Sequence, residues 1–350
     1  AGIIGIIKSW GNIKSAVGLA AKELKGKSAV DENVKRTQRD ISFKIIAIGS
    51  LVCILVTFLF FWFGVMDGNL LFAIIAILLV AAIAFLFTTV AANAIAIVGS
   101  NPVSGMTLMT LIVASTIFVA IGLSGTQGII ASMVIGGVVC TALSMAGGMV
   151  TDMKIGYWLG STPAKQQTWK AVGTLVSAAT VGGVILLLNK AYGFTNPDVM
   201  AAPQANAMAA VIDPLMMGGD TPWILYSVGA VFACLLNWLG VPALAFSLGM
   251  FIPFHLNAPL LVGGAISWFV GSRSKDEKLN KARQEKGTLL ASGFIAGGAL
   301  MGVVSAGMTL SGFSYECPLS DGVTSALAVV IYLALIGFLI CSCLKAKKED

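Results

Sequence analysis

Long apolar runs, separated by short polar segments, form the main pattern along this chain. Eight of the runs are near the length of about 20 residues at which a helix crosses the hydrocarbon core of a bilayer. They lie at 42–66, 70–97, 105–124, 128–150, 167–189, 222–240, 287–308 and 323–344. The pattern therefore predicts an all-α, polytopic membrane protein with about eight transmembrane helices.

A ninth apolar run, 241–271, is interrupted by the sequence FIPFHLNAP at 251–259. The pieces on either side of 253–259 are too short to cross a bilayer separately. We expect a re-entrant hairpin over 241–271 with its tip near 254–257. One tilted full span is the alternative, and it would move the following basic loop to the other side of the membrane.

A second polar break, IVGSNPVSGMT at 97–107, lies between two full-length apolar runs. Irregular backbone persists within hydrocarbon only where protein or a water-filled cavity shields its peptide groups, because each of these groups needs a partner. Paired interruptions of this kind are typical of a transporter's binding region. Asn-Pro and Ser-Gly are also ordinary turn dipeptides, so a tight loop between two spanning helices is the alternative.

The charges of the loops predict an orientation. Residues 1–40 carry many basic side chains at amphipathic spacing, and we interpret them as a cytoplasmic connector that precedes a transmembrane domain at 41–350. The loops at 151–166 and 272–286 and the C-terminal tail fall on the same side and are also basic, whereas the outer loops are acidic apart from Lys190. The positive-inside rule supports this assignment.

The composition excludes a soluble globular protein. Apolar residues make up 57% of the chain and charged residues 11%, whereas soluble domains carry roughly 25% charged residues. The net charge of +6 comes from loops and the tail and not from a basic, aromatic surface, so no nucleic-acid partner is expected. The six cysteines and one histidine lack ligand spacing, and we expect no metal site and no cofactor.

The outer loop at 190–221 is the longest on its side, and it contains a predicted interfacial or re-entrant helix around 202–216. Long loops of this kind are often functional. A lid that only covers helix ends is the alternative, and the sequence does not separate the two.

Four motifs follow one another along the chain: SNPVSGMT (100–107), TDMKIGYWLGSTPAKQQ (151–167), NKAYGF with APQAN (189–206) and LASGFIAGGALMG (290–302). In this order they resemble the oligopeptide transporter (OPT) family, which includes the yellow-stripe-like metal-chelate carriers, and most closely its prokaryotic branch. The resemblance covers nearly the whole chain, but it corresponds to the C-terminal half of a sixteen-helix family member.

The resemblance implies a symporter of the bacterial cytoplasmic membrane. Its substrates are expected to be small oligopeptides or metal-chelate complexes, moved by alternating access and typically with protons. An N-terminal half, on the same or a separate chain, is the expected partner besides membrane lipid, and a homodimer is left open. No charged residue lies well inside a predicted span, although proton carriers commonly need one. The titrating group is then Asp152, Asp213, Glu316, His255 or a residue of the missing half.

Substrate contacts are expected at the two breaks, because interrupted helices expose peptide groups and half-helix dipoles that can hold a carboxylate or an amine. For Asn101 a helix cap is an equal alternative. For His255, the only histidine, a proton-carrying role stands beside a simple hydrogen-bonded one. The candidate substrate-binding residues are Asn101, Ser104, Thr107, His255 and Asn257.

The cytoplasmic motif loop is expected to brace an inner gate, with Asp152 and Lys154 pairing to neighbouring loops. Topological anchoring by charge alone is the alternative. The other motif residues that we assign to this loop are Gly156, Tyr157, Gly160, Pro163, Lys165 and Gln166.

Three other functions are weighed against a carrier. A passive channel also lines its path with irregular backbone. A membrane enzyme is not expected, because the sequence has neither an H-E-x-x-H nor a G-x-S-x-G motif. The third is a half that is inert until it meets its partner chain.

Overall fold

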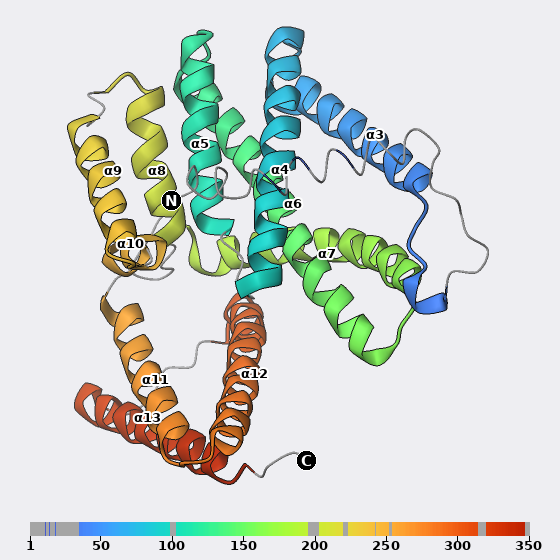
Figure 1. Cartoon of the computed structure of the whole chain (residues 1–350). Coiled ribbons are helices and arrows are strands. Elements are labelled where there is room, and N and C mark those ends of the chain that lie inside the picture. The colour runs from blue at the N-terminus through green and yellow to red at the C-terminus, as the bar shows by residue number, and fades with distance from the viewer. Residues whose placement is uncertain are drawn as a thin grey trace. The chain divides into compact units, whose positions relative to one another are not determined.

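The computed structural model describes residues 35–98, 103–194, 203–219, 223–241, 243–251, 254–313 and 320–346, together with Gly11, Lys14 and Gly18 (Figure 1). Within these residues the regular structure is helical, without strands. A short 3-10 turn, η1 (Arg36–Gln38), is followed by α3 (Phe43–Phe60), which continues into the π-helical segment η2 (Phe61–Val65). The other helices are α4 (Leu70–Val98), α5 (Val103–Ala120), α6 (Gly125–Leu159), α7 (Pro163–Tyr192), α8 (Pro203–Met216), α9 (Trp223–Trp238), α10 (Ala243–Phe251), α11 (Phe254–Ser272), α12 (Glu277–Leu310) and α13 (Asp321–Leu344).

The all-α membrane fold predicted from the apolar runs is confirmed. Among the described residues, six helical stretches are long and apolar enough to cross a membrane, and two shorter apolar helices cover Gly105–Ala120 and Trp223–Trp238. Each of these eight corresponds to one predicted run. The helices α6, α7 and α12 have 35, 30 and 34 residues. At about 1.5 Å per residue they exceed a hydrocarbon core of about 30 Å, so their ends extend beyond it.

The first predicted break is shorter in the structure than in the sequence pattern. Helix α4 continues to Val98 and α5 begins at Val103, so residues 97–98 and 103–107 are helical and only 99–102 lie outside the described residues. Pro102 directly precedes the first helical residue. Proline is tolerated at a helix start, because the N–H groups there have no intrahelical acceptor.

The second predicted break also differs from the expectation. Helix α11 begins at Phe254 and runs through Pro259, so the expected irregular tip at 254–257 is helical. With 19 residues, α11 is about 28 Å long at 1.5 Å per residue, and the prediction of two half-length pieces is wrong for this one. The re-entrant path of 241–271 stays a prediction.

The Asn257 side chain of α11 forms a hydrogen bond to the last turn of α10. The Asn257 Nδ2 atom donates a hydrogen bond of 2.7 Å to the Gly249 carbonyl oxygen in the last turn of α10. A helical partner for that carbonyl would be the N–H of residue 253, and Pro253 has none. The amide of Asn257 therefore satisfies a carbonyl that the local sequence leaves unpaired.

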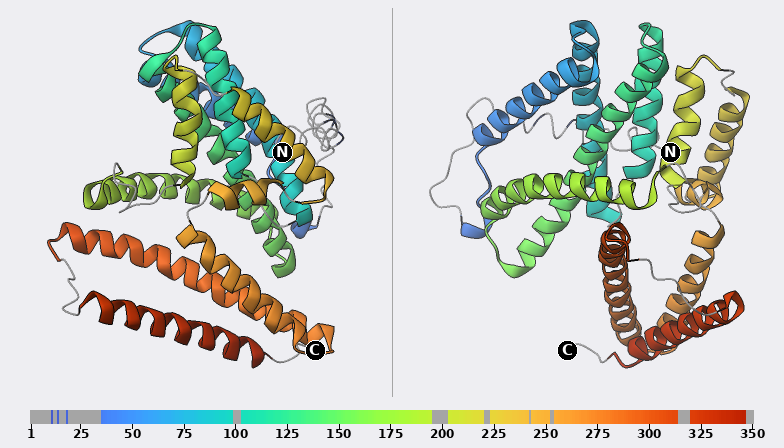
Figure 2. Two further views of the ribbon diagram at one scale, coloured as in Figure 1. Left: turned by 90° about the vertical axis from the view of Figure 1, so that its left-hand side faces the viewer. Right: turned by 180° about the vertical axis from the view of Figure 1, so that it is seen from behind.

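The chain divides into two compact units, 1–176 with 203–248 and 177–202 with 249–350. The first unit contains most of the buried core. Its helix α5 packs between α4 and α8 and lies against α6 (Figures 1 and 2). The helix predicted at 202–216 is confirmed as α8, and its Ile212 and Met216 side chains are buried against α5 and α6.

The second unit is built around α11, α12 and α13, which contact one another pairwise. Few of its described side chains are buried, chiefly Val270, Ala306 and Cys343. The side chains of Val330 and Leu333 on α13 are 61% and 60% exposed. Apolar surface of this extent is unfavourable in water and is expected where lipid or another protein covers it.

Candidate functional site

The end of α6 and the start of α7 form a tight helical hairpin at the motif loop. Gly160 ends α6 with φ of 66° and ψ of 29°, in the left-handed region, and its N–H donates to the carbonyls of Gly156 and Tyr157. Glycine adopts this conformation without the steric cost of a Cβ. Pro163 begins α7, where its missing N–H removes no helical hydrogen bond. The motif glycine and proline thus set the geometry of the turn.

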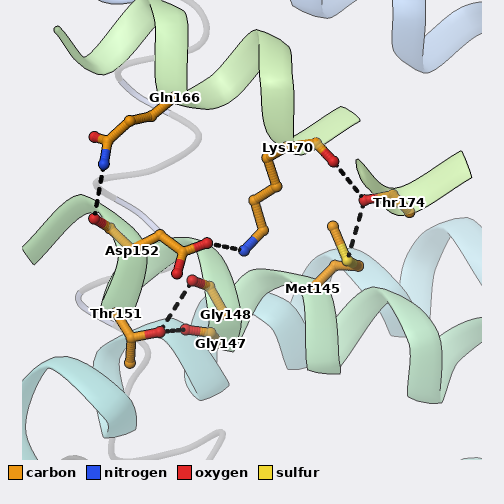
Figure 3. A network of polar contacts seen from close by, with 8 residues as sticks. All are labelled: Met145, Gly147, Gly148, Thr151, Asp152, Gln166, Lys170 and Thr174. Atoms are coloured by element: carbon orange, nitrogen blue, oxygen red, sulfur yellow. Dashed lines mark hydrogen bonds and ion pairs between the residues drawn. The ribbon is translucent and has the colours of Figure 1, made fainter. Parts of the chain in front are cut away.

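An ion pair joins the two helices just above this turn. The Lys170 Nζ atom of α7 contacts the Asp152 carboxylate of α6 (Figure 3). One turn earlier on α7, the Gln166 Nε2 atom donates to the Asp152 carbonyl oxygen at 3.3 Å. One turn later, the Thr174 hydroxyl lies 3.7 Å from the Met145 sulfur. Gln166, Lys170 and Thr174 are four residues apart and therefore lie on one face of α7. This face makes the polar contacts to α6.

Two glycines of α6 leave space for these side chains. A Cβ atom at Gly156 would lie 2.1 Å from Gln166 Oε1, and one at Gly148 would lie 3.1 Å from Lys170 Nζ. The first distance is far shorter than a van der Waals contact, so the Gln166 amide would have to move. The motif glycine at 156 is therefore explained by the close approach of Gln166.

The connector segment at 36–41 is fastened to the same turn. Arg36 donates to the Gly160 carbonyl at 2.9 Å and to the Thr162 hydroxyl at 3.1 Å. This contact places a cation at the C-terminal end of α6, where the helix dipole and the unpaired carbonyls favour it. Gln167 accepts from the Ile41 N–H at 2.9 Å and donates to Asp40 at 3.0 Å. The motif residue Lys165 and Arg36 line an open hollow of about 780 Å³ beside this joint.

Lys154 and Tyr157 are placed differently from the expectation. The Lys154 Nζ atom lies 5.5 Å from the centroid of the Tyr157 ring and 5.3 Å from that of Trp158, both on its own helix. The two rings are 78% and 70% exposed. In the described part of the chain, Lys154 thus makes cation–π contacts within α6 rather than pairing with a neighbouring loop. This combination suits a helix end at the level of lipid headgroups.

Buried hydroxyl groups form a second polar feature, of which the sequence predicted Thr107 alone. Thr107, Thr110, Ser115 and Ser132 are buried on α5 and α6. The Thr110 hydroxyl donates to the Met106 carbonyl, but the Ser115 and Ser132 hydroxyls have no hydrogen-bond partner among the described residues. Leu111 of α5 packs against Gly136 of α6 in the same interface.

Comparison with known proteins identifies the family. A model described as OPT oligopeptide transporter protein matches residues 2–309. This chain belongs to the OPT family. The match covers the first break, the motif loop and α8, so the resemblance inferred from the motifs is confirmed, and the chain is a multi-pass membrane protein.

One curated relative of this OPT-family chain is a putative oligopeptide transporter from Haemophilus influenzae. The two are 26% identical over 292 residues, which cover 71% of this chain and 46% of the relative. The chain thus spans about half the length of the curated relative that it matches. No solved structure matches the chain.

The five substrate-binding candidates are distributed over both units of this OPT-family chain. Asn101 lies outside the described residues, Ser104 is in the first turn of α5, and Thr107 is buried on α5. His255 and Asn257 are in the first turn of α11, and the Asn257 amide is engaged by Gly249. A single site formed by all five stays a prediction. Among the described residues, no three His, Cys, Asp or Glu side chains gather as a metal site needs.

Proposed function

We propose that this chain is one half of a secondary active transporter that moves small oligopeptides across the bacterial cytoplasmic membrane by alternating access. The observation that carries the proposal is the OPT family match over residues 2–309. The match includes the break between α4 and α5 and the α6–α7 hairpin. The partner in this proposal is an N-terminal half, which supplies the remainder of the substrate path.

The substrate site in this proposal is formed by the two helix interruptions. Helix α5 begins at Val103, and its first N–H groups, with the positive end of the helix dipole, suit a peptide carboxylate. Helix α10 ends at Phe251, and carbonyl groups at a helix C-terminus suit an ammonium group. Asn101, Ser104, Thr107, His255 and Asn257 are the proposed side-chain contacts.

The α6–α7 hairpin is the proposed brace of the inner gate. Its support is the contact between Asp152 and Lys170, which ties the two helices at the predicted cytoplasmic boundary. A rocking motion that separates α6 from α7 has to open this pair. Asp152 is also one of the proposed proton carriers. Asp213, Glu316 and His255 are the other proposed proton carriers.

The test of the proposal is counterflow in proteoliposomes that contain this chain together with its N-terminal half. Uptake of a labelled tripeptide is measured with and without unlabelled tripeptide inside. A carrier is expected to take up label several-fold faster when preloaded, because the loaded site returns more readily than the empty one. Equal uptake in both preparations would indicate a pore and contradict the proposal.

Two control preparations define the substrate and the partner. Vesicles preloaded with an iron chelate distinguish the two substrate classes, since acceleration by the chelate alone would overturn the assignment to peptides. Vesicles with this chain alone test the need for the second half, and saturable uptake by them would contradict it.

A further inference from the structure

Unit 2 contains a cavity of about 200 Å³ lined by α11, α12 and α13, three helices that contact one another (Figure 2). Its lining residues recur at one-turn spacing, as Gly263, Ile266, Ser267 and Val270 do on α11. Two glycines allow the close packing around it. A Cβ at Gly271 would lie 2.2 Å from the Gln284 amide nitrogen, and one at Gly287 would lie 3.2 Å from the Cys343 sulfur.

The walls of the cavity are of two chemical kinds. Ile266, Val270 and Leu339 supply an apolar wall. Arg283 and Gln284 bring a guanidinium group and an amide to the cavity at the end of α12 nearest the basic loop. No aspartate or glutamate is among the described residues that line it. An amphiphile with an anionic head matches this lining better than a purely polar or purely apolar ligand.

Arg283 has an unmet need for an acceptor. Its Nε atom is buried and has no hydrogen-bond partner among the described residues. An N–H of a charged group that is removed from water without an acceptor is costly. Guanidinium groups pair most strongly with carboxylate or phosphate oxygens, to which they donate two parallel hydrogen bonds.

The surroundings of the cavity place it at the level of lipid headgroups. The segment 273–286 has six basic and three acidic residues, an excess of three positive charges. The Arg273 guanidinium lies 4.6 Å from the centroid of the Phe269 ring, and Trp268 is 73% exposed. Aromatic rings and basic side chains at a helix end are typical of the membrane–water boundary. Basic pockets between helices on that side bind anionic headgroups.

We infer that this cavity binds an anionic membrane phospholipid. Arg283 donates to the phosphate oxygens, Gln284 lies beside the headgroup, and one acyl chain lies along Ile266, Val270 and Leu339. The apolar wall is the reason to assign a lipid and not free phosphate, which has no part that would occupy it. The inference concerns a site for lipid and does not depend on the proposed transport activity.

The test compares lipids on the assembled, purified transporter in detergent. Phosphatidylglycerol is added as the anionic probe and phosphatidylcholine as the neutral one, while inorganic phosphate serves as the free anion. Melting temperature and retained lipid in native mass spectrometry are the two readouts. Phosphatidylglycerol is expected to raise the melting temperature more than either of the other two. An equal rise with inorganic phosphate, or with phosphatidylcholine, would overturn the assignment to an anionic lipid.

Two single substitutions test whether phosphatidylglycerol binds at this cavity. Arg283→Gln is expected to lower the affinity for phosphatidylglycerol about tenfold or more, the scale of losing a charge-assisted hydrogen bond. Lys281→Gln removes the same charge from the same segment and does not line the cavity, so it should keep nearly wild-type affinity. Equal losses in the two variants would indicate a diffuse charge effect and contradict the inference.

A second variant covers the case in which Arg283→Gln does not fold. Ala291→Phe fills the cavity from the α12 wall and leaves every charge in place. It is expected to elute as wild type in gel filtration and to lose tightly retained phosphatidylglycerol. Undiminished retention in this variant would mean that the lipid binds elsewhere.

Discussion

At the scale of single residues, the contact between Asp152 and Lys170 is the basis of the proposed gate. The two side chains are 47% and 20% exposed. For exposed pairs the contribution to stability is about 0.2–1 kcal/mol, too small to hold the fold together. The pair is better understood as a positional contact that fixes how α7 lies on α6.

Exchanging the two charges tests this role. Asp152→Asn and Lys170→Gln should each lower peptide uptake several-fold, because each leaves one charge without its partner. The double variant Asp152→Lys with Lys170→Asp should recover part of the uptake. A double-mutant cycle on the melting transition should give a coupling free energy of about 1 kcal/mol.

The matched control for this experiment is Lys154→Gln, which removes a nearby charge that contacts only aromatic rings of its own helix in the described structure. It should leave uptake close to wild type. If the two single variants insert correctly and show wild-type uptake, the gate hypothesis is contradicted. The charges of the motif would then serve only to orient the chain in the membrane.

The residues of this joint show what the sequence can reveal. Asp152, Gly156 and Gln166 were identifiable from the motif, and all three take part in the α6–α7 contact. Lys170 was missed, because residue spacing shows which side chains share a face of one helix. It does not show which residues of the neighbouring helix they contact. The available signal for Lys170 was a charge near the start of the predicted span 167–189, since such a residue needs a partner. The buried Ser115 and Ser132 left no comparable signal.

At the scale of helices, small residues decide which faces approach. Gly136 and Gly137 are adjacent on α6, yet their surroundings differ. A Cβ at Gly136 would lie 2.5 Å from the Leu111 Cδ2 atom, whereas one at Gly137 would meet nothing within 4 Å. Within lipid, glycine at a helix interface allows close backbone packing. Within the part of the chain that the structure describes, Gly136 is therefore an interface residue and Gly137 is not.

Alanine substitutions at these two positions should have opposite effects. Gly136→Ala is expected to lower the stability by about 1–3 kcal/mol, the usual cost of overpacking a core. Gly137→Ala is expected to raise it by about 0.5–1 kcal/mol through helix propensity. Leu111→Val combined with Gly136→Ala should recover part of the loss. Equal melting temperatures for the two alanine variants would contradict the packing of α5 on α6.

Helix positions were predictable from the sequence, and the limits of the breaks were not. Eight apolar runs gave eight helices because the length and polarity of a run decide whether it can span. Pro253, Asn257 and Pro259 suggested one long irregular tip. In the structure α11 accommodates Pro259 within the helix, and Asn257 supplies the hydrogen-bond donor that Pro253 lacks. The spacing of residues does not show that a side chain will replace a missing backbone donor in this way.

At the scale of the whole molecule, exposed apolar surface and chain length lead to one interpretation. In the most apolar stretch of α7, none of the residues is buried. In that of α13, 6% of the residues are buried. The chain also covers 46% of its curated relative. We expect lipid and the N-terminal half to cover these faces. The resemblance of its motifs predicts an N-terminal half, but the sequence does not predict which helix faces such a half would cover.

The central proposal is a peptide site to which residues of both breaks contribute. The most direct measurement is cross-linking between Asn101→Cys and His255→Cys in a variant without native cysteines, assembled with the N-terminal half. Asp152→Cys with Lys170→Cys serves as the positive control, since these residues are in contact. A short bifunctional maleimide is expected to join positions 101 and 255, and a bound tripeptide should slow the reaction. A readily cross-linked control pair with no product between 101 and 255 would contradict the claim.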